Sequence, residues 1–411
     1  MSESGYRSFL KTPYVAQLVT SMTLARLPVG VVTIVLVIFV NMYYSASISG
    51  IATAAFMGGM AIIAPLFGRQ VDKGRGPMML VLTAILELIS VCLLSWVVIS
   101  CMPSWMVLLC SLATGAFMPP VAAVTRSLWP VMLDISLIST AYNFDLLIID
   151  VLYVGGPLLA SIFVGLGVPE LGLILTTIGS SIGAIALARI VPVRECAQHN
   201  KKRSETFKQT INAIKAPLFT LPLILLMLGL FSRITFAAWL ETAIPLFYTD
   251  LGNAMLGSVV ISAWSVGSVT GSVLFNRFQP SPRTISTPAQ LVLFTAIVLA
   301  VACVVPFCMS LLPMCIILAL VGITVAATDN LYYQIAGNLT AHERQGEMFS
   351  WMNTASNIGL SAGAFFAGMS VEHLGFKASF TLPTLCVVIS FGIVVGAFFA
   401  IKQYKKTHQL D

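Results

Sequence analysis

Seven ionisable side chains lie within long apolar runs of this sequence, and these residues are best placed to do chemistry. They are Arg26, Glu87, Asp145, Asp150, Arg233, Glu241 and Asp329. A charge at the centre of a lipid bilayer costs about 2.5–3.5 kcal/mol on insertion scales, so such residues face a protein interior or a wet cavity. Buried carboxyl groups can exchange protons near neutral pH. The pattern therefore predicts a pathway for protons or a small charged substrate.

Depth along the helices suggests how the charges of the first half pair. Arg26 lies about 12 residues into its apolar run, and Asp150 lies about 10 residues into its own. At ~1.5 Å per residue the two reach a similar depth, so we expect an ion pair between them. Asp145, nearly 8 Å away along the same helix by the same rise, is the alternative partner or a protonation site. A fixed pair that only holds helices together would explain the same residues.

The second half offers two candidate proton carriers. Arg233 and Glu241 are eight residues apart and so lie roughly on one helix face, and Tyr332 and Tyr333 follow Asp329 closely. Asp329 is the principal candidate for a proton carrier or for the binder of a cationic substrate group, and Glu241 is the second. For Glu87, a neutral, hydrogen-bonded carboxyl group is the simpler explanation, and a role in transport is the alternative.

Composition indicates what must position these side chains. Hydrophobic residues make up 58% of the chain and charged residues 9%, whereas charged residues are about a quarter of a soluble domain. Apolar runs of the ~20 residues that a membrane helix needs lie on both sides of one long polar stretch, Arg189 to Lys215. We expect an all-α membrane protein with two six-helix bundles, residues 1–190 and 217–411, joined by a linker at 191–216.

Twelve transmembrane helices are expected. They cover about residues 14–40, 46–67, 77–99, 104–125, 140–166, 169–187, 217–248, 254–275, 287–309, 311–336, 348–371 and 378–401. Pro119 and Pro120 remove two backbone donors and predict a break in the fourth helix. Lysines and arginines gather in the loops on the side of the linker and both termini, and Lys377 alone lies opposite. This bias predicts an inner-membrane protein with both termini in the cytoplasm.

Several function classes are excluded by the same sequence. The four histidines fall in loops or tails, and the eight cysteines form no CxxC pair. No metal-ligand cluster, phosphate-cradling loop or nucleophile elbow is visible, so we expect neither a metal nor a cofactor, and no enzyme. The basic residues form no single patch of the kind that nucleic acid requires. The expected partners are a small molecule, protons and the lipid bilayer, and we expect a monomer.

The two halves echo each other. The spacing from Arg26 to Arg69 nearly matches that from Arg233 to Arg277. Val121-Ala122-Ala123 before Gly155-Gly156 is echoed by Val325-Ala326-Ala327 before Gly359. Such echoes are typical of transporters built from repeated bundles, whose substrate site lies at the repeat interface near the midplane.

The loop after the second helix carries Gly68, Asp72, Lys73 and Arg75 in the run GRQVDKGRG. It resembles the signature loop of the major facilitator superfamily, although the spacing after Lys73 is one residue shorter. The resemblance implies twelve helices, with the first, fourth, seventh and tenth lining a central cavity. A carboxylate beside basic groups at a helix end can form a charge-assisted clasp that controls rocking of one half. A solvated turn is the alternative explanation.

The fifth helix contains Gly155-Gly156-Pro157 followed by Leu158-Leu159-Ala160-Ser161. This run is similar to a motif of drug/proton antiporters in that superfamily, without the motif's upstream glycines. Small residues let helices approach closely, and the resemblance implies close packing between the halves. Matching small faces occur later in the chain, at Gly267, Gly271, Gly359 and Gly363. We therefore expect a secondary transporter that exports a small organic molecule in exchange for protons; an importer of a peptide, sugar or metabolite is the alternative.

Overall fold

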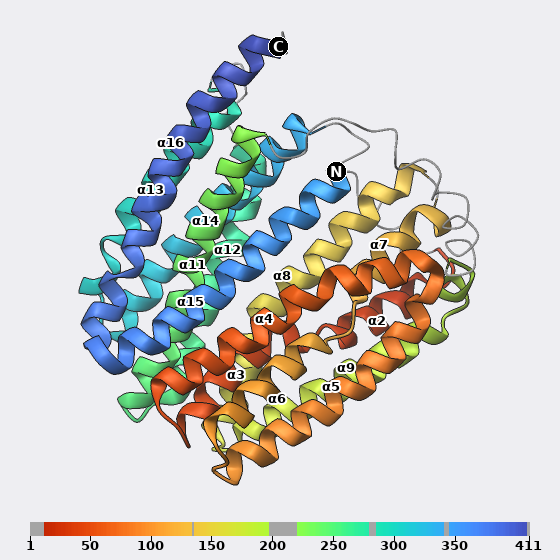
Figure 1. The fold of residues 1–411 in the computed structure, drawn as a ribbon, viewed down its shortest axis with the longest axis vertical. Helices are drawn as coiled ribbons and strands as arrows, with labels where there is room; N and C mark the ends of the chain where they lie inside the picture. Colours follow the sequence, from red (N-terminus) through yellow and green to blue (C-terminus); the bar gives the residue numbers. More distant parts are fainter. Residues whose placement is uncertain (1–11, 134, 197–219, 279–284, 341–344, 409–411) are drawn as a thin grey trace. The chain divides into compact units, whose positions relative to one another are not determined.

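The computed structural model describes residues 12–133, 135–196, 220–278, 285–340 and 345–408 of the 411-residue chain. Within these ranges the secondary structure is helical throughout, without a strand. The chain forms two compact units, coloured along the sequence in Figure 1. The first unit comprises residues 1–39 and 55–215, and the second comprises residues 40–54 and 216–411. Of the expected linker, residues 191–196 are helical and 197–216 lie outside the described ranges.

The elements from the N-terminus to residue 189 follow the apolar runs. They are α2 (Val15–Ala25), α3 (Pro28–Asn41), α4 (Ala46–Gln70), η1 (Val71–Arg75), α5 (Gly76–Ile99), α6 (Ser104–Ala116), α7 (Val121–Met132), α8 (Ile135–Gly165) and α9 (Pro169–Arg189). The element η1 is one turn of π-helix in the signature-like loop. Helix α4 begins in the second unit and ends in the first.

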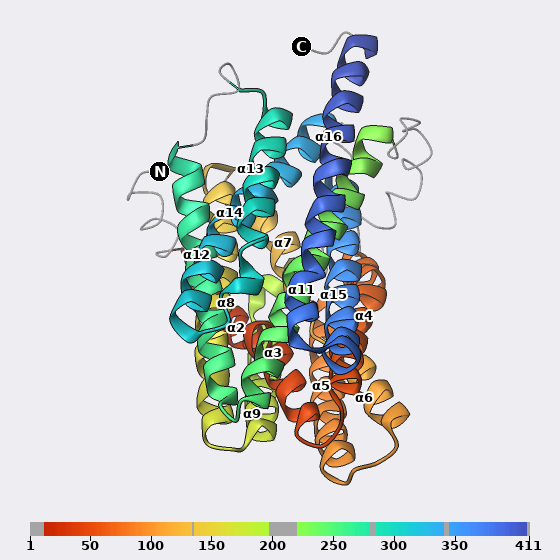
Figure 2. The same cartoon turned by 90° about the vertical axis from the view of Figure 1, so that its left-hand side faces the viewer.

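The second unit continues with helices of similar length. They are α11 (Leu221–Asp250), α12 (Ala254–Phe278), α13 (Thr287–Ala302), the short 3-10 turn η3 (Val305–Phe307), α14 (Leu311–Leu339), α15 (Gln345–Thr381) and α16 (Pro383–His408). Helix α11 runs beside α15 and α16 (Figure 2). Counting α2 with α3 and α6 with α7, the described helices account for the twelve predicted crossings. Ten spans among them are long and apolar enough to cross a membrane, and α8 contains a shorter apolar stretch, Val151–Gly165.

Proline explains both interrupted crossings. Helix α2 ends at Ala25 and α3 begins at Pro28, which has no N–H to continue the ladder of hydrogen bonds. The predicted break at Pro119 and Pro120 is confirmed, because these residues separate α6 from α7. Interrupted helices free backbone carbonyls, which in a membrane must find partners inside the protein.

Helix α5 shows how an apolar sequence still distinguishes two faces. Its exposed side chains recur every three or four residues and include Met78, Leu82, Ile85, Ile89 and Trp96. The opposite face is buried and carries small or polar residues among its aliphatic ones: Leu80, Thr83, Ala84, Glu87, Val91 and Leu94. This spacing is that of one helix face against lipid and one against protein. Glu87 therefore points into the first unit.

Close glycine contacts repeat at the same places in the two units. A Cβ on Gly115 would lie on the backbone of Phe56, and one on Gly59 would meet the backbone of α6. In the second unit, Gly322 of α14 meets the backbone of Trp264, and Gly267 meets that of Ala319. The equivalent residues are 207 or 208 positions apart, as are Arg26 and Arg233. The two units are therefore built as a structural repeat, as expected of repeated-bundle transporters.

The first turn of α4 is capped by a residue distant in sequence. The Glu372 carboxylate on α15 accepts a hydrogen bond of 2.7 Å from the backbone N–H of Ser47. Together with the Ser45 side chain, whose contribution is the larger, this bond lowers the pKa of Glu372 below its ordinary value. A carboxylate at a helix N-terminus also interacts favourably with the helix dipole.

We expect Glu372→Gln to destabilise the protein by at most about 1 kcal/mol, because the lost cap is exposed to solvent. A lowered folded-state pKa stabilises the protein above the unfolded value of about 4.3 and loses that contribution as the pH falls through the folded value. Thermal unfolding of the purified protein should therefore separate wild type from variant at neutral pH, with the two melting temperatures converging in acid. A constant difference at all pH values would show that Glu372 does not act through its charge.

Candidate functional site

The first unit contains a buried network centred on Arg26, at the break between α2 and α3. Arg26 Nη1 donates to Asp145 Oδ1 at 2.7 Å, and Nη2 donates to Thr125 Oγ1 at 3.2 Å. Thr125 in turn donates to Asp145 Oδ1 at 3.4 Å. All three residues are buried, with at most 4% of each residue's surface exposed. Three elements, the α2–α3 break, α7 and α8, thus converge on one ion pair.

Among the described side chains the partner of Arg26 is Asp145, the alternative candidate, whereas the depth argument favoured Asp150. The reason is the position of the helix start. Helix α8 begins at Ile135, five residues before the expected start at residue 140, which places Asp145 ten residues beyond its beginning. The same depth argument, applied to the observed start, selects Asp145. The side chain of Asp150 lies outside what the structure describes.

The second unit contains a matching pair, Arg233 of α11 with Asp329 of α14. The two members differ sharply in exposure, because the Arg233 side chain is 1% exposed and the Asp329 side chain 37%. Their atoms are within ion-pair distance, but the alignment is not that of a hydrogen bond. Arg233 therefore acts on Asp329 as a buried positive charge, while part of the Asp329 side chain, though not its Oδ1 atom, is exposed.

The Arg233 guanidinium is otherwise poorly satisfied. Its Nε, Nη1 and Nη2 atoms have no hydrogen-bond partner among the described residues. Glu241, eight residues and about 12 Å further along α11, is half-buried and interacts with Arg233 electrostatically. Arginine presents five N–H donors, and leaving buried donors unpaired is costly. A rearrangement or a bound group that accepts hydrogen bonds from Arg233 would therefore stabilise this site.

The two tyrosines after Asp329 do not belong to one surface. Tyr332 is completely buried in the core of the second unit, and its hydroxyl lies 3.2 Å from Ser390 Oγ. Ser390 in turn donates to the carbonyl of Gly229 at 2.9 Å. Tyr333 is half-buried, with its ring 6.0 Å from that of Phe349. Tyr332 thus holds α14 against α11 and α16, and the structure gives it no face toward a cavity.

The signature-like loop forms the element η1, which is kinked at Gly74. Gly74 within it has φ +76°, a left-handed conformation that glycine adopts without strain. Arg75 is exposed and donates to the Gln70 side chain at 3.1 Å, and Lys73 is exposed as well. Gly68 has open space around it, and the Asp72 side chain lies outside the described structure. The clasp expected from this loop stays a prediction.

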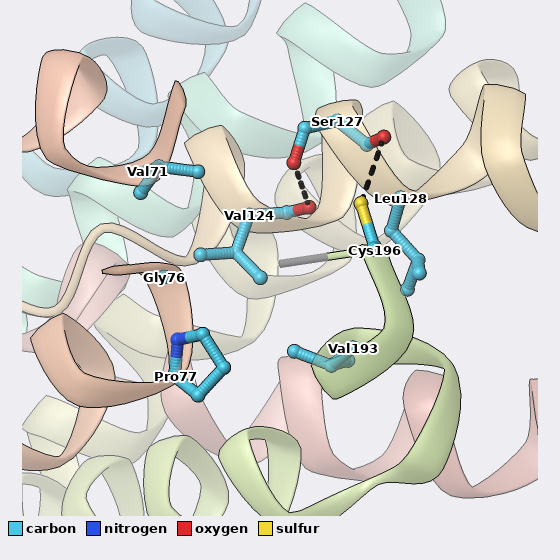
Figure 3. A pocket seen from close by; sticks show the side chains of 8 residues that line it. All are labelled: Val71, Gly76, Pro77, Val124, Ser127, Leu128, Val193 and Cys196. Atoms are coloured by element: carbon cyan, nitrogen blue, oxygen red, sulfur yellow. Dashed lines mark hydrogen bonds between the residues drawn. The ribbon is translucent and has the colours of Figure 1, made fainter. Parts of the chain in front are cut away.

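A small pocket lies behind this loop, next to the start of α5 (Figure 3). Cys196 donates a weak hydrogen bond of 3.4 Å to the carbonyl of Ser127 at its edge. The lining residues are Val71, Gly76, Pro77, Val124, Ser127, Leu128, Val193 and Cys196. The enclosed space is about that of one water molecule, too small for an organic substrate.

Most of the glycines predicted to allow close helix packing meet neighbouring helices of their own unit. Gly267 and Gly271 lie against α14, and Gly359 and Gly363 lie against α11. Gly156 meets the backbone of Gly30 in α3, whereas Gly155 has open space around it and Pro157 is buried beside it. Gly368 of α15 also packs closely against α4, at Gly50. Small residues permit such close helix packing, and a role of these glycines between the halves stays a prediction.

Sequence analysis missed Thr125 and Ser180 as members of polar networks. Each is an ordinary hydroxyl residue in an apolar helix, where most such groups bond to the preceding turn of their own backbone. Thr125 lies five residues after Pro120, within the segment whose backbone the prolines disturb. Ser180 lies next to Ser181 in α9; both hydroxyl groups contact α5, and that of Ser180 also contacts the end of α2. Their roles depend on neighbours that only the fold brings together.

Comparisons with known proteins agree with this architecture. One similar structure is a bacterial homologue of the human lysosomal transporter Spinster, crystallised in an inward-facing and occupied conformation. The match covers 99% of this chain and 98% of the homologue, with a TM-score of 0.65 and 14% sequence identity. The nucleoside transporter NupG matches over 93% of this chain and 98% of its own, with a TM-score of 0.65 and 14% identity. A bacterial homologue of the iron transporter ferroportin in an inward-facing state matches over 97% of this chain and 100% of its own, with a TM-score of 0.64 and 14% identity. Curated protein sequences give no match.

These structural likenesses establish the fold, and the sequence itself establishes the family. The family model described as Major Facilitator Superfamily matches residues 18–291 and 287–410, which is nearly the whole chain. The match agrees with the multi-pass helical architecture. The chain belongs to the Major Facilitator Superfamily, and it is a secondary transporter of a small molecule.

Proposed function

We propose that this transporter exports a small organic molecule from the cell in exchange for protons, by alternating access. The substrate class is that of drugs or secreted natural products such as a peptide antibiotic or siderophore. We place the protein in the inner membrane as a monomer, with both termini and the linker in the cytoplasm. Export is supported by the small-residue run from Gly155 to Ser161, which is similar to that of drug/proton antiporters.

The observation that carries the proposal is the unequal exposure of the pair between Arg233 and Asp329. The Arg233 side chain is held in protein, while the Asp329 side chain is 37% exposed, although its Oδ1 atom, which faces Arg233, is buried. A proton or a cationic group of the substrate can therefore reach Asp329 and compete with Arg233 for it. Mutually exclusive occupancy of one carboxylate is a physical means of exchanging a proton for a cation. Glu241, on the same helix as Arg233, is the second candidate for the carrier.

Asp329→Asn tests this assignment. Asparagine keeps the size of the side chain but cannot bind or release the proton, so we expect loss of transport driven by a pH gradient. The measurement is substrate-induced proton release from everted vesicles, followed with a pH dye across a drug panel that includes ethidium. Glu241→Gln is the parallel variant. If Asp329→Asn transports with an unchanged pH dependence, Asp329 does not carry the proton.

An importer is the alternative supported by the similarity to other transporters. A structure described as that of proton dependent oligopeptide transporters gives a TM-score of 0.66 over 97% of this chain and 100% of its own, at 13% identity. The vesicle experiment separates the two, because everted vesicles accumulate an exported compound and release protons. Proton uptake that accompanies entry of a peptide or nucleoside into right-side-out vesicles would favour import.

A further inference from the structure

Glu87 is a buried carboxyl group that takes part in neither ion pair of the described residues. It lies on the protein-facing side of α5 and is 2% exposed. Its Oε2 atom is 3.1 Å from Ser180 Oγ on α9. Burying an ionised carboxylate costs several kcal/mol unless a countercharge and several donors compensate it. A single hydroxyl group is a weak partner for a charge, and so the site suits the neutral acid.

The hydrogen-bond geometry of Ser180 supports the same conclusion independently. Its Oγ atom also lies 3.1 Å from the carbonyl oxygen of Ala25, the last residue of α2. A serine hydroxyl has one proton to donate, and a carbonyl can only accept. Ser180 therefore satisfies both contacts fully only if it donates to Ala25 and accepts from a protonated Glu87.

The Ala25 carbonyl needs this donor. In a continuous helix it would accept from the amide of Val29, but that amide is bonded to the carbonyl of Arg26 at 3.0 Å. The preceding residue, Pro28, has no N–H to offer. Ala25 is 1% exposed, so water does not replace the missing donor. Gly183 brings α9 so close to α2 that an added Cβ would lie 2.4 Å from the Ala25 nitrogen, which fixes Ser180 at the break.

Among the described residues, the charged side chains near Glu87 do not provide it with a counterion. The Arg26 guanidinium is next to Ala25 in sequence but is bonded to Asp145 and Thr125. On α9 the titratable residues lie at the two ends of the helix, about 14–15 Å along its axis from Ser180. The remaining titratable side chains on the elements packed against α5 or on α9 are Glu170, Arg189, Cys110, Asp72, Lys73 and Arg75.

We propose that Glu87 is a proton-binding site of the first unit, and that Ser180 couples its protonation to the break between α2 and α3. When the Glu87 proton leaves to water, the Ser180 hydroxyl turns to donate to the carboxylate. The Ala25 carbonyl then loses its donor, directly beside the ion pair of Arg26 and Asp145. Protonation of Glu87 thus completes the series of hydrogen bonds from Glu87 through Ser180 to Ala25, and deprotonation breaks it. The coupling to transport rests on the proton exchange proposed above.

Infrared spectroscopy of the purified protein in lipid vesicles tests the protonation without any substrate. We expect the carbonyl-stretch band of a protonated carboxylic acid at neutral pH in wild type and in the control Glu170→Gln. In Glu87→Gln that band should be reduced, since the amide fills the same space without the acid. Ser180→Ala should shift the band, because the acid loses its acceptor. An identical band in Glu87→Gln, or no shift in Ser180→Ala, would overturn the assignment.

Transport in proteoliposomes tests the coupling, with ethidium as the probe. We expect Glu87→Gln to lose accumulation of ethidium driven by a pH gradient while retaining ethidium exchange without a gradient. Accumulation equal to that of wild type would refute a role of Glu87 in coupling. If wild type itself moves no ethidium or other panel compound with protons, the proposed exchange fails, whereas the infrared result still decides whether Glu87 holds a proton.

Discussion

Arg26→Met is expected to destabilise the protein by about 3 kcal/mol, near the lower end of the range for breaking a buried ion pair. The loss arises because Asp145, 1% exposed, would keep only the 3.4 Å bond from Thr125. The lower end applies because an unfolded chain in lipid also finds partners for its polar groups. Thermal unfolding in detergent, followed by the loss of monodisperse protein, measures the change.

A second substitution separates the cost of the orphaned charge from that of lost packing. Arg26→Met combined with Asp145→Leu removes both charges, and we expect it to recover most of the stability lost in the single variant. Arg75→Met is the matched control, because Arg75 is exposed and bonded only to Gln70 among the described side chains; its effect should stay within about 0.5 kcal/mol. A double variant as unstable as Arg26→Met would mean that packing, and not charge, dominates the site.

Much of this architecture follows from composition and proline positions. The twelve crossings were predictable because a membrane core of ~30 Å requires about 20 apolar residues for each helix. The break at Pro119 was predictable from the missing backbone donors. The involvement of Arg26 and Arg233 in ion pairs follows from the cost of an unpaired charge in lipid, which leaves a buried arginine few alternatives.

The partners of these charges were harder to predict, because pairing depends on helix starts and on rotation about the helix axis. An error of five residues at the start of α8 was enough to favour Asp150 over Asp145. Tyr332 and Tyr333 are adjacent, yet one lies in the core and the other packs near Phe349. In a largely apolar helix the two faces differ by only a few small or polar residues, so periodicity is a weak guide to which of two adjacent residues is buried.

The internal repeat shows the same limit, because sequence spacing alone does not identify which glycines are equivalent in the two units. The echo from Arg26 to Arg233 has the offset of 207 that the paired glycines follow, whereas the echo from Gly155 to Gly359 has an offset of 204. At an offset of 207, Gly156 corresponds to Gly363. Both are tight backbone contacts, Gly156 against Gly30 and Gly363 against Thr235. The physically equivalent glycine is thus the second of the pair, and only the packing distinguishes it from its neighbour.

Two adjacent glycines of α8 should therefore respond oppositely to the same substitution. A Cβ on Gly156 would lie 2.4 to 2.5 Å from backbone atoms of Gly30. Because backbone cannot rotate away as a side chain can, we expect Gly156→Ala to cost about 3 kcal/mol, the upper part of the range for overpacking. In Gly155→Ala the methyl group would enter open space, and the better helix propensity of alanine gives a gain of up to about 1 kcal/mol.

The measurement is the difference in melting temperature between the two variants, together with ethidium transport in the same vesicles. Both substitutions add one methyl group at neighbouring positions, so expression, lipid and detergent effects are shared. We expect Gly156→Ala to lose stability and transport because α3 and α8 are forced apart, and α8 carries Asp145 to its partner Arg26. Gly155→Ala should retain both. Equal melting temperatures would show that the small-residue run of α8 does not act through its contact with α3.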